Sequence, residues 1–134
     1  MSSKRGSVRY YVQVNAPADT VWAYITDPTR LPEWFPGVTS CVVEGNQRTI
    51  TTAMGLPMEE DLLTNNPIER RFQYRIKGGL FREHLSTIDV FELTPETCLI
   101  SYSCDADPAP LALVISGGAS DGLATLKALA EGKK

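Results

Sequence analysis

Four side chains in the middle of the chain are of types that transfer protons or hold a polar atom of a small molecule: Glu60, Tyr74, His84 and Tyr102. His84 is the only histidine, and its ordinary pKa near neutrality suits a general acid or base. If Glu60 faces an apolar cavity, its pKa rises and it becomes a usable acid or base. We therefore predict His84 and Glu60 as candidate catalytic residues, and the tyrosine hydroxyls suit the polarisation of a carbonyl.

Each of these residues also has a simpler interpretation. A lone histidine on a half-apolar strand is more often a hydrogen-bonded wall residue or a ligand contact than a catalyst. Glu60 lies between Glu59 and Asp61, so a solvated acidic rim is an equal alternative. Tyrosines commonly fill core space while their hydroxyls bond a carbonyl or water. The residue types alone leave these alternatives open.

The three cysteines, Cys41, Cys98 and Cys104, have neither CxxC nor Cys/His spacing. We therefore expect reduced, partly buried thiols, and neither a zinc site nor a disulfide framework. The sequence also contains no phosphate-binding glycine loop, no GxSxG and no HExxH pattern. We accordingly expect no metal and no cofactor.

Alternating apolar residues place the four side chains on strands. Val8, Tyr10, Val12 and Val14 alternate with polar residues, which predicts a strand over 7–14 with one buried face. Turn residues separate six further strand-like segments, predicted at 38–44, 47–54, 58–65, 70–77, 82–93 and 97–106. Connections this short favour an antiparallel meander.

Helices bracket these strands. Pro17 suits the first turn of a short helix that Asp27-Pro28 ends, and a second helical turn is predicted at about 28–34. A stripe of apolar residues over 111–130 predicts a long C-terminal helix. Gly117-Gly118 should kink that helix or loosen its first half, because glycine is a poor helix former.

Strand parity predicts which residues face the interior. Folding 58–65 onto 70–77 sets Glu60 opposite Ile76, and folding 82–93 onto 70–77 sets His84 opposite the same residue. Because neighbouring strands lie about 4.8 Å apart, both side chains could reach one ligand. The residues predicted to face inward are Glu60, Leu62, Thr64, Phe72, Tyr74, Ile76, His84, Ser86, Ile88, Val90, Cys98, Ile100, Tyr102 and Cys104.

These elements predict an α+β fold in which a curved antiparallel sheet of about seven strands surrounds a long C-terminal helix, with two short helices after the first strand. A chain of 134 residues with 43% hydrophobic content fits a single domain over 1–134. A sheet that curls around one helix leaves concave apolar space, where small ligands bind.

Six short motifs carry a resemblance to a known family: 16–22 (APADTVW), Asp27-Pro28, 34–38 (WFPGV), Glu44-Gly45, 74–76 (YRI) and 87–90 (TIDV). With the order of elements, they resemble the START-related (SRPBCC) superfamily, in its polyketide cyclase/dehydrase and lipid-transport branch. The resemblance covers essentially the whole chain and implies the helix-grip fold, with a hydrophobic cavity between the sheet and the C-terminal helix. Because that superfamily includes cyclases, lipid carriers and hormone receptors, the resemblance says more about fold than about function.

The leading functional expectation is therefore binding of a hydrophobic, ring-containing or lipid-like small molecule. The alternative is a polyketide cyclase or aromatase that catalyses aldol cyclisation and dehydration, for which a shaped cavity and one acid/base group suffice. A third hypothesis is a protein-interaction module with an incidental cavity. The predicted ligand-binding residues are Trp34, Phe35, Met54, Leu56, Leu62, Phe72, Tyr74, Ile76, Ser86, Ile88, Tyr102 and Leu123.

Charge and hydropathy narrow the partners. The net charge of −3 offers no cationic footprint for a nucleic acid. We find no apolar run of about 18 residues and no signal-peptide pattern, and so expect no membrane insertion and a cytoplasmic location. The apolar turn at Met54–Met58 suggests a ligand gate, a partner surface, a homodimer contact or simple packing onto the C-terminal helix.

Overall fold

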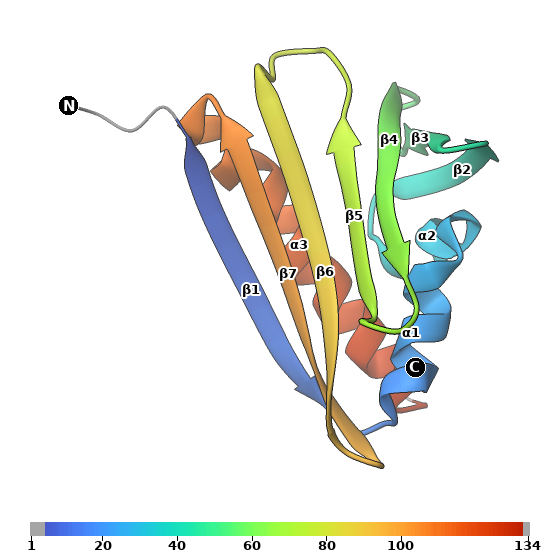
Figure 1. Ribbon diagram of the computed structural model, residues 1–134. Coiled ribbons are helices and arrows are strands. Elements are labelled where there is room, and N and C mark those ends of the chain that lie inside the picture. The colour runs from blue at the N-terminus through green and yellow to red at the C-terminus, as the bar shows by residue number, and fades with distance from the viewer. Residues whose placement is uncertain (1–4, 133–134) are drawn as a thin grey trace.

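The computed structural model describes residues 5–132, and its central element is one seven-stranded antiparallel sheet (Figure 1). The strand order across the sheet is β1-β7-β6-β5-β4-β3-β2. The strands are β1 (Gly6–Val14), β2 (Val38–Glu44), β3 (Gln47–Thr52), β4 (Pro57–Asn66), β5 (Arg71–Ile76), β6 (Glu83–Thr94) and β7 (Thr97–Asp107). This sheet confirms the predicted strand number and the antiparallel meander.

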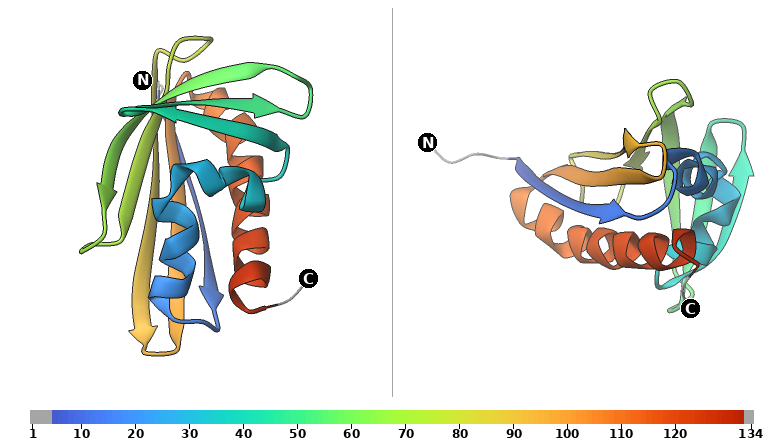
Figure 2. Two further views of the ribbon diagram at one scale, coloured as in Figure 1. Left: turned by 90° about the vertical axis from the view of Figure 1, so that its right-hand side faces the viewer. Right: turned by 90° about the horizontal axis from the view of Figure 1, so that it is seen from below.

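A long helix, α3 (Ala109–Ala130), covers one face of the sheet. It packs on β1 and β7, and Figure 2 shows it running along those strands. The approach is close at Gly6, where a Cβ would lie 2.6 Å from the carbonyl oxygen of Ala109. The predicted helix-grip architecture is confirmed.

Helix α3 is one uninterrupted helix that continues through Gly117-Gly118. Two glycines one turn apart receive aromatic rings. A Cβ on Gly118 would lie 2.8 Å from Cζ of Phe35, and a Cβ on Gly122 would lie 3.1 Å from Cζ3 of Trp34. The glycines therefore remove side-chain bulk where the aromatic rings meet the helix backbone. We call these four residues the aromatic notch.

Helix α3 also qualifies, by length and composition alone, as a candidate membrane span. Its mean hydropathy reaches 1.2 over an 18-residue window, which corrects the expectation that no segment is this apolar. Its apolar residues lie on both sides of the helix: Leu113 and Val114 are exposed, whereas Leu123 and Leu126 are buried. The core helix of a soluble protein passes the same test, and α3 packs one face against the sheet.

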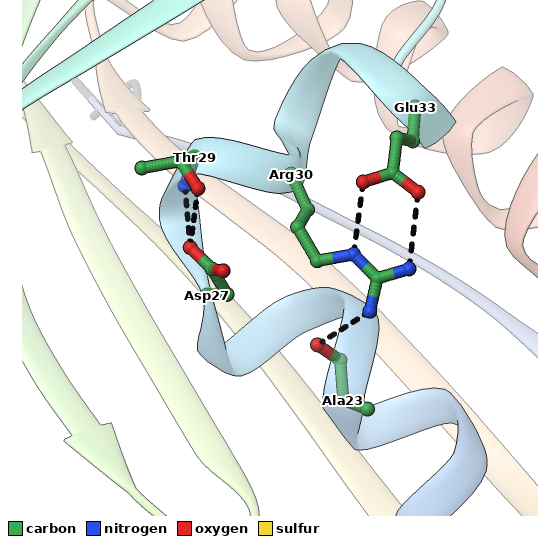
Figure 3. A network of polar contacts seen from close by, with 5 residues as sticks. All are labelled: Ala23, Asp27, Thr29, Arg30 and Glu33. Atoms are coloured by element: carbon green, nitrogen blue, oxygen red, sulfur yellow. Dashed lines mark hydrogen bonds and ion pairs between the residues drawn. The ribbon is translucent and has the colours of Figure 1, made fainter.

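A short helical connector places Trp34 and Phe35 at the notch. It consists of α1 (Ala18–Thr26), the 3-10 turn η1 (Pro28–Arg30) and α2 (Leu31–Trp34). Figure 3 shows how polar contacts hold it: a carboxylate oxygen of Asp27 accepts the Thr29 amide at 3.0 Å, and Arg30 forms a two-point ion pair with Glu33 at 2.8 and 3.0 Å. Arg30 also donates to the carbonyl oxygen of Ala23. These contacts fix the direction in which the chain leaves α2.

The strand register confirms the central part of the parity prediction. Glu60 pairs with Ile76, and the register of β5 with β6 continues to set His84 opposite Ile76. A β-bulge between Leu62 and Thr64 shifts the pairing of the rest of β4, so that Thr64 pairs with Gln73. The Thr64 hydroxyl donates a hydrogen bond to Oε1 of Gln73 at 2.9 Å. Thr64 therefore lies on the outer face, contrary to the prediction, because a bulge adds one residue to the alternation.

Candidate functional site

A cavity of about 480 Å³ lies between the inner face of the sheet and the N-terminal half of α3. Strands β3 to β7 form its floor and walls, and the segment after α2 closes one side. Its lining residues are Phe35, Pro36, Gly37, Val38, Ile50, Thr52, Ala53, Met54, Leu56, Met58, Glu60, Tyr74, Ile76, His84, Ser86, Tyr102, Cys104, Val114, Ile115, Gly118 and Ala119. Most of these side chains are apolar, and the polar ones, except Thr52 on β3, lie on β4 to β7.

Both candidate catalytic residues and seven of the predicted ligand-binding residues line this cavity. The seven are Phe35, Met54, Leu56, Tyr74, Ile76, Ser86 and Tyr102. The other five do not line it: Trp34, Leu62, Phe72, Ile88 and Leu123. They belong to the main core or pack against it, because α1, α2 and the C-terminal half of α3 fill the other end of the interior. Strand parity identifies the inner face, but it does not show where along that face the space is filled.

His84 is buried on β6, and its two ring nitrogens have different roles. The main-chain amide of Ile76 donates to Nδ1 at 2.8 Å, so Nδ1 carries no proton in the neutral ring. The proton is then on Nε2, which donates to Oγ of Ser86 at 2.9 Å. Burial lowers the pKa of His84 to about 4, with Asp105 opposing the change. His84 is therefore neutral at pH 7, with both nitrogens in use.

Tyr74 and Tyr102 point their hydroxyls at each other from β5 and β7, in a short hydrogen bond. Burial raises the pKa of Tyr74 to about 12, and hydrogen bonds to Tyr102 and Ser86 are among the effects that oppose the rise. Burial also raises the pKa of Tyr102. Both phenols are protonated at pH 7, so they can donate hydrogen bonds.

Glu60 is buried on β4 and is paired with Arg48 of β3, directly across the ladder. Nε of Arg48 lies 2.6 Å from a carboxylate oxygen of Glu60, and both side chains are at most 4% exposed. Burial raises the pKa of Glu60 while Arg48 opposes the rise. Burial by itself lowers the pKa of Arg48, but the Glu60 carboxylate and other contacts raise it overall, so the guanidinium stays charged. The solvated acidic rim is ruled out for Glu60.

Arg48 is the main site residue that sequence reasoning missed. Its guanidinium carbon lies 4.6 Å from the centre of the Tyr74 ring and 5.5 Å from that of Phe72. A signal existed: Arg48 shares a strand face with the buried Ile50, and the 47–54/58–65 hairpin sets it opposite Glu60. A charged residue is normally assigned to the solvent side, so only its opposite-charge partner indicates burial.

The mouth of the cavity is exposed and apolar. Met54 is 85% exposed, Leu56 61% and Val114 72%, and all three also line the cavity. The turn between β3 and β4 therefore borders the mouth instead of packing fully onto α3. Large exposed apolar side chains at one rim indicate an opening through which an apolar molecule can enter.

A second, larger hollow of about 940 Å³ lies on the outer face of the sheet, over β1, β5, β6 and β7. Polar and charged side chains line much of it, and two of them, Arg71 and Asp89, pair with each other at 3.2 Å. Within residues 5–132, no three His, Cys, Asp or Glu side chains are grouped to hold a metal ion. Because its lining is more polar, the outer hollow suits an apolar ligand less well than the inner cavity does.

Comparison with known families gives one match over nearly the whole chain. Residues 5–131 match the model of a family described as polyketide cyclase/dehydrase and lipid transport. No curated protein sequence matches the chain significantly.

Solved structures share the fold. Protein XoxI from Bacillus cereus matches with a TM-score of 0.86 at 25% identity, covering 93% of this chain and 95% of that one. A START superfamily protein from Mycobacterium smegmatis matches with a TM-score of 0.77 at 20% identity, covering 94% and 97%. Norcoclaurine synthase from Thalictrum flavum, in complex with dopamine and hydroxybenzaldehyde, matches with a TM-score of 0.76 at 18% identity, covering 97% and 88%. The last two likenesses concern the fold alone.

Proposed function

The chain belongs to the polyketide cyclase/dehydrase and lipid transport family of START-like proteins, and we propose that it binds a hydrophobic, ring-containing or lipid-like small molecule in the cavity beneath α3. Membership of this family implies hydrophobic ligand binding. The single observation that carries the finer proposal is the cavity itself: about 480 Å³, lined mostly by apolar side chains and bordered by exposed ones.

The size and lining of the cavity suit such a ligand. Small-molecule sites typically have volumes of about 300–1,000 Å³ and combine an apolar lining with a few polar groups that orient the ligand. Here Glu60, Tyr74, His84, Ser86 and Tyr102 supply the polar groups, all on the sheet side. Opposite them, α3 contributes apolar and small residues. Burial of an apolar ring or chain against α3 would therefore favour binding, and the polar groups of the sheet would orient the ligand.

The protonation states favour binding over acid/base chemistry. His84 is neutral at pH 7 with both ring nitrogens in hydrogen bonds. The Tyr74 phenol, with a pKa of about 12, keeps its proton. The Glu60 carboxylate is engaged by Arg48 at 2.6 Å. A general acid or base works best when its pKa is near the working pH and it can reach the reacting atom.

The alternative, a polyketide cyclase, draws on one observation: Glu60 and the tyrosine hydroxyls line the same apolar cavity. In such a reaction a base removes a proton from a carbon between two carbonyls. The carbanion attacks a further carbonyl, the alkoxide takes a proton, and water leaves. Glu60 would be the base, since burial raises its pKa, with His84 as the second candidate and a tyrosine hydroxyl polarising the carbonyl.

Ligand binding is tested by thermal unfolding and native mass spectrometry of the full chain with sterols, long-chain fatty acids and polyphenols. A ligand that binds only the folded state stabilises it by RT ln(1 + [L]/Kd), so a true ligand raises Tm with concentration. We expect at least one class to raise Tm and to give a 1:1 complex. No shift and no complex with any class would contradict the proposal.

The cyclase alternative is tested with a poly-β-ketone thioester as the substrate. Cyclised, dehydrated product with the wild type, and its loss in both His84→Gln and Glu60→Gln, would support catalysis by these residues. Product formation unchanged in both folded variants would remove them from the mechanism. Binding of the thioester without cyclisation would leave the binding function as the better account.

A further inference from the structure

The outer face of the sheet, opposite the cavity, carries the larger hollow over β1, β5, β6 and β7. Every residue that lines this hollow comes from a strand, and Figure 2 shows α3 on the other side of β1 and β7. Two rings on this face are exposed to solvent, Tyr11 by 65% and Phe91 by 49%. The function proposed above does not use this face, so we consider what would pack on it.

The side chains of this face are of the types found in protein–protein interfaces. Arg9, Arg71, Tyr11 and Phe91 line the hollow, whereas no lysine or glutamate among residues 5–132 does. Arginine and aromatic residues are enriched in such interfaces, and lysine and glutamate are depleted. Within the described residues, the Tyr11 side chain makes no hydrogen bond or ring contact. These features indicate a protein as the partner.

Two charged side chains on this face lack an ion-pair partner. Arg9 on β1 and Asp105 on β7 are diagonal neighbours in the strand register, yet within residues 5–132 neither forms an ion pair. The other two charged residues of the lining, Arg71 and Asp89, pair with each other at 3.2 Å. The formal charges of the lining therefore cancel. A partner of one strong charge, such as a nucleic acid or an anionic membrane, gains no net attraction here.

A second copy of the chain satisfies both unpaired charges at once. In a two-fold symmetric pair, each residue of one copy contacts the same residue of the other that it is contacted by. If Arg9 of one copy meets Asp105 of the other, symmetry generates the same ion pair a second time. Charge complementarity therefore selects a second copy as the occupant of this face.

The strand register gives the position of the symmetry axis. Neighbouring strands lie about 4.8 Å apart, and residues on one face of a strand lie about 6.8 Å apart along it. On this grid, an axis that bisects the line from Arg9 to Asp105 passes between Ser103 and Thr87. The side chains nearest the axis are therefore short, which lets the two sheets approach.

We propose that this outer face is the two-fold interface of a homodimer, in which Arg9 of each copy pairs with Asp105 of the other. The same operation carries Tyr11 of each copy over Leu85 of the other, a half-buried apolar residue opposite Asp105 in the register. The inference goes beyond the proposed function and does not depend on it, because the cavity lies on the inner face.

The first test is the oligomeric state of the full chain. Sedimentation velocity is measured over a dilution series from about 1 mM to about 1 μM, because a small and partly polar interface gives a reversible dimer. We expect the weight-average sedimentation coefficient to fall from the dimer value to the monomer value on dilution. A chain that is monomeric at every concentration would overturn the inference.

A charge swap then tests the proposed ion pair. Arg9→Glu and Asp105→Arg each place like charges across the axis twice, so each should raise the dimer Kd at least about tenfold. The double variant Arg9→Glu/Asp105→Arg restores opposite charges and should return Kd to within about threefold of the wild-type value. Circular dichroism checks that each variant is folded. Single variants that dimerise like the wild type, or a double variant as weakly dimeric as they are, would overturn the pairing.

A third comparison leaves these charges unchanged and decides the question even where Asp105→Arg does not fold. Tyr11→Ser removes the aromatic ring from the interface and should raise the dimer Kd at least about tenfold. Leu113→Ser is the matched control, because Leu113 is 68% exposed but lies on α3, and it should leave Kd unchanged. A dimer weakened only by Leu113→Ser would place the interface on α3 and overturn the inference. A dimer unaffected by Tyr11→Ser would overturn it as well.

Discussion

The two ends of the interior beneath α3 are built differently. Around the middle of α3, on the side toward its C-terminus, Trp34 and Phe35 fill the space against Gly118 and Gly122, where a Cβ would lie 2.8 to 3.1 Å from their rings. At the N-terminal end, the strands carry Ser86, Cys104 and His84, and about 480 Å³ remains unfilled. Phe35 and Gly118 belong both to the aromatic notch and to the cavity lining, so they form the boundary between the packed region and the cavity.

This difference shows how one sheet and one helix provide both stability and a binding site. Packed aromatic rings give dispersion contacts and apolar burial at one end. Polar side chains at the other end form hydrogen bonds with one another, and a cavity remains beside them. Stability should therefore depend on the aromatic notch, and ligand affinity on the cavity.

The largest expected effect breaks the packed end. Trp34 is 3% exposed and stacks edge-on with Phe35 and Tyr102 at centroid distances of 5.8 and 6.3 Å. Trp34→Ala should lower the free energy of unfolding by about 3–5 kcal/mol, measured by urea denaturation. Met54→Ala, at an 85% exposed residue of the mouth, should change it by less than about 0.5 kcal/mol. Equal losses of unfolding free energy in the two variants would contradict the claim that stability depends on the aromatic notch and not on the cavity mouth.

The next effect concerns the ion pair in the cavity wall. Glu60→Ala leaves the Arg48 guanidinium buried without its carboxylate and should cost about 3–5 kcal/mol of unfolding free energy. The double variant Arg48→Met/Glu60→Leu removes both charges and should recover most of that loss. Glu59→Ala, on the exposed side of the same strand, is the control and should be neutral. A double variant as unstable as Glu60→Ala would show that the pair contributes net stability.

His84 should make stability depend on pH. Its pKa is about 4 in the folded protein and near 6.5 when unfolded, so only the unfolded state takes up a proton between these values. Unfolding free energy should therefore fall by about 3 kcal/mol as the pH drops from 6.5 to 4. His84→Gln keeps an acceptor and a donor but does not titrate, so this part of the slope should vanish. Glu60 contributes with the opposite sign, since its pKa is raised, and it cancels in the comparison of the two proteins.

The smallest effect compares two neighbouring glycines of α3. Gly117→Ala meets no atom within 4 Å and should raise the unfolding free energy by about 0.5–1 kcal/mol through helix propensity. Gly118→Ala places a Cβ 2.8 Å from the Phe35 ring and should lower it by about 1 kcal/mol. Thermal unfolding of the two variants side by side tests this. A gain in both would mean that Phe35 moves aside without cost.

Much of the fold follows from the sequence because alternation and turn chemistry are local. The apolar alternation on β5, β6 and β7 identifies their inner faces, and the short turns set Glu60 and His84 beside Ile76. The placement of Thr64 on the outer face could not be predicted from the sequence, because no residue type in this segment indicates the β-bulge.

The site was less predictable because it depends on long-range packing. Gly118 is a poor helix former by propensity, yet its role depends on Phe35, more than eighty residues earlier in the chain. Arg48 and Glu60 are charged, and only their mutual pairing explains their burial. Which inward residues line a cavity and which fill the core depends on where α1, α2 and α3 cover the sheet.

The most direct test of the central claim is to fill the open end and measure binding. Ile115 lines the cavity from α3, whereas Leu113 is 68% exposed and lies outside it. Calorimetric titration of 9-fluorenone should give saturable 1:1 binding to the wild type and to Leu113→Trp, and at least about tenfold weaker binding to a folded Ile115→Trp. Equal affinity for all three proteins would contradict the account, because the ligand would then bind elsewhere.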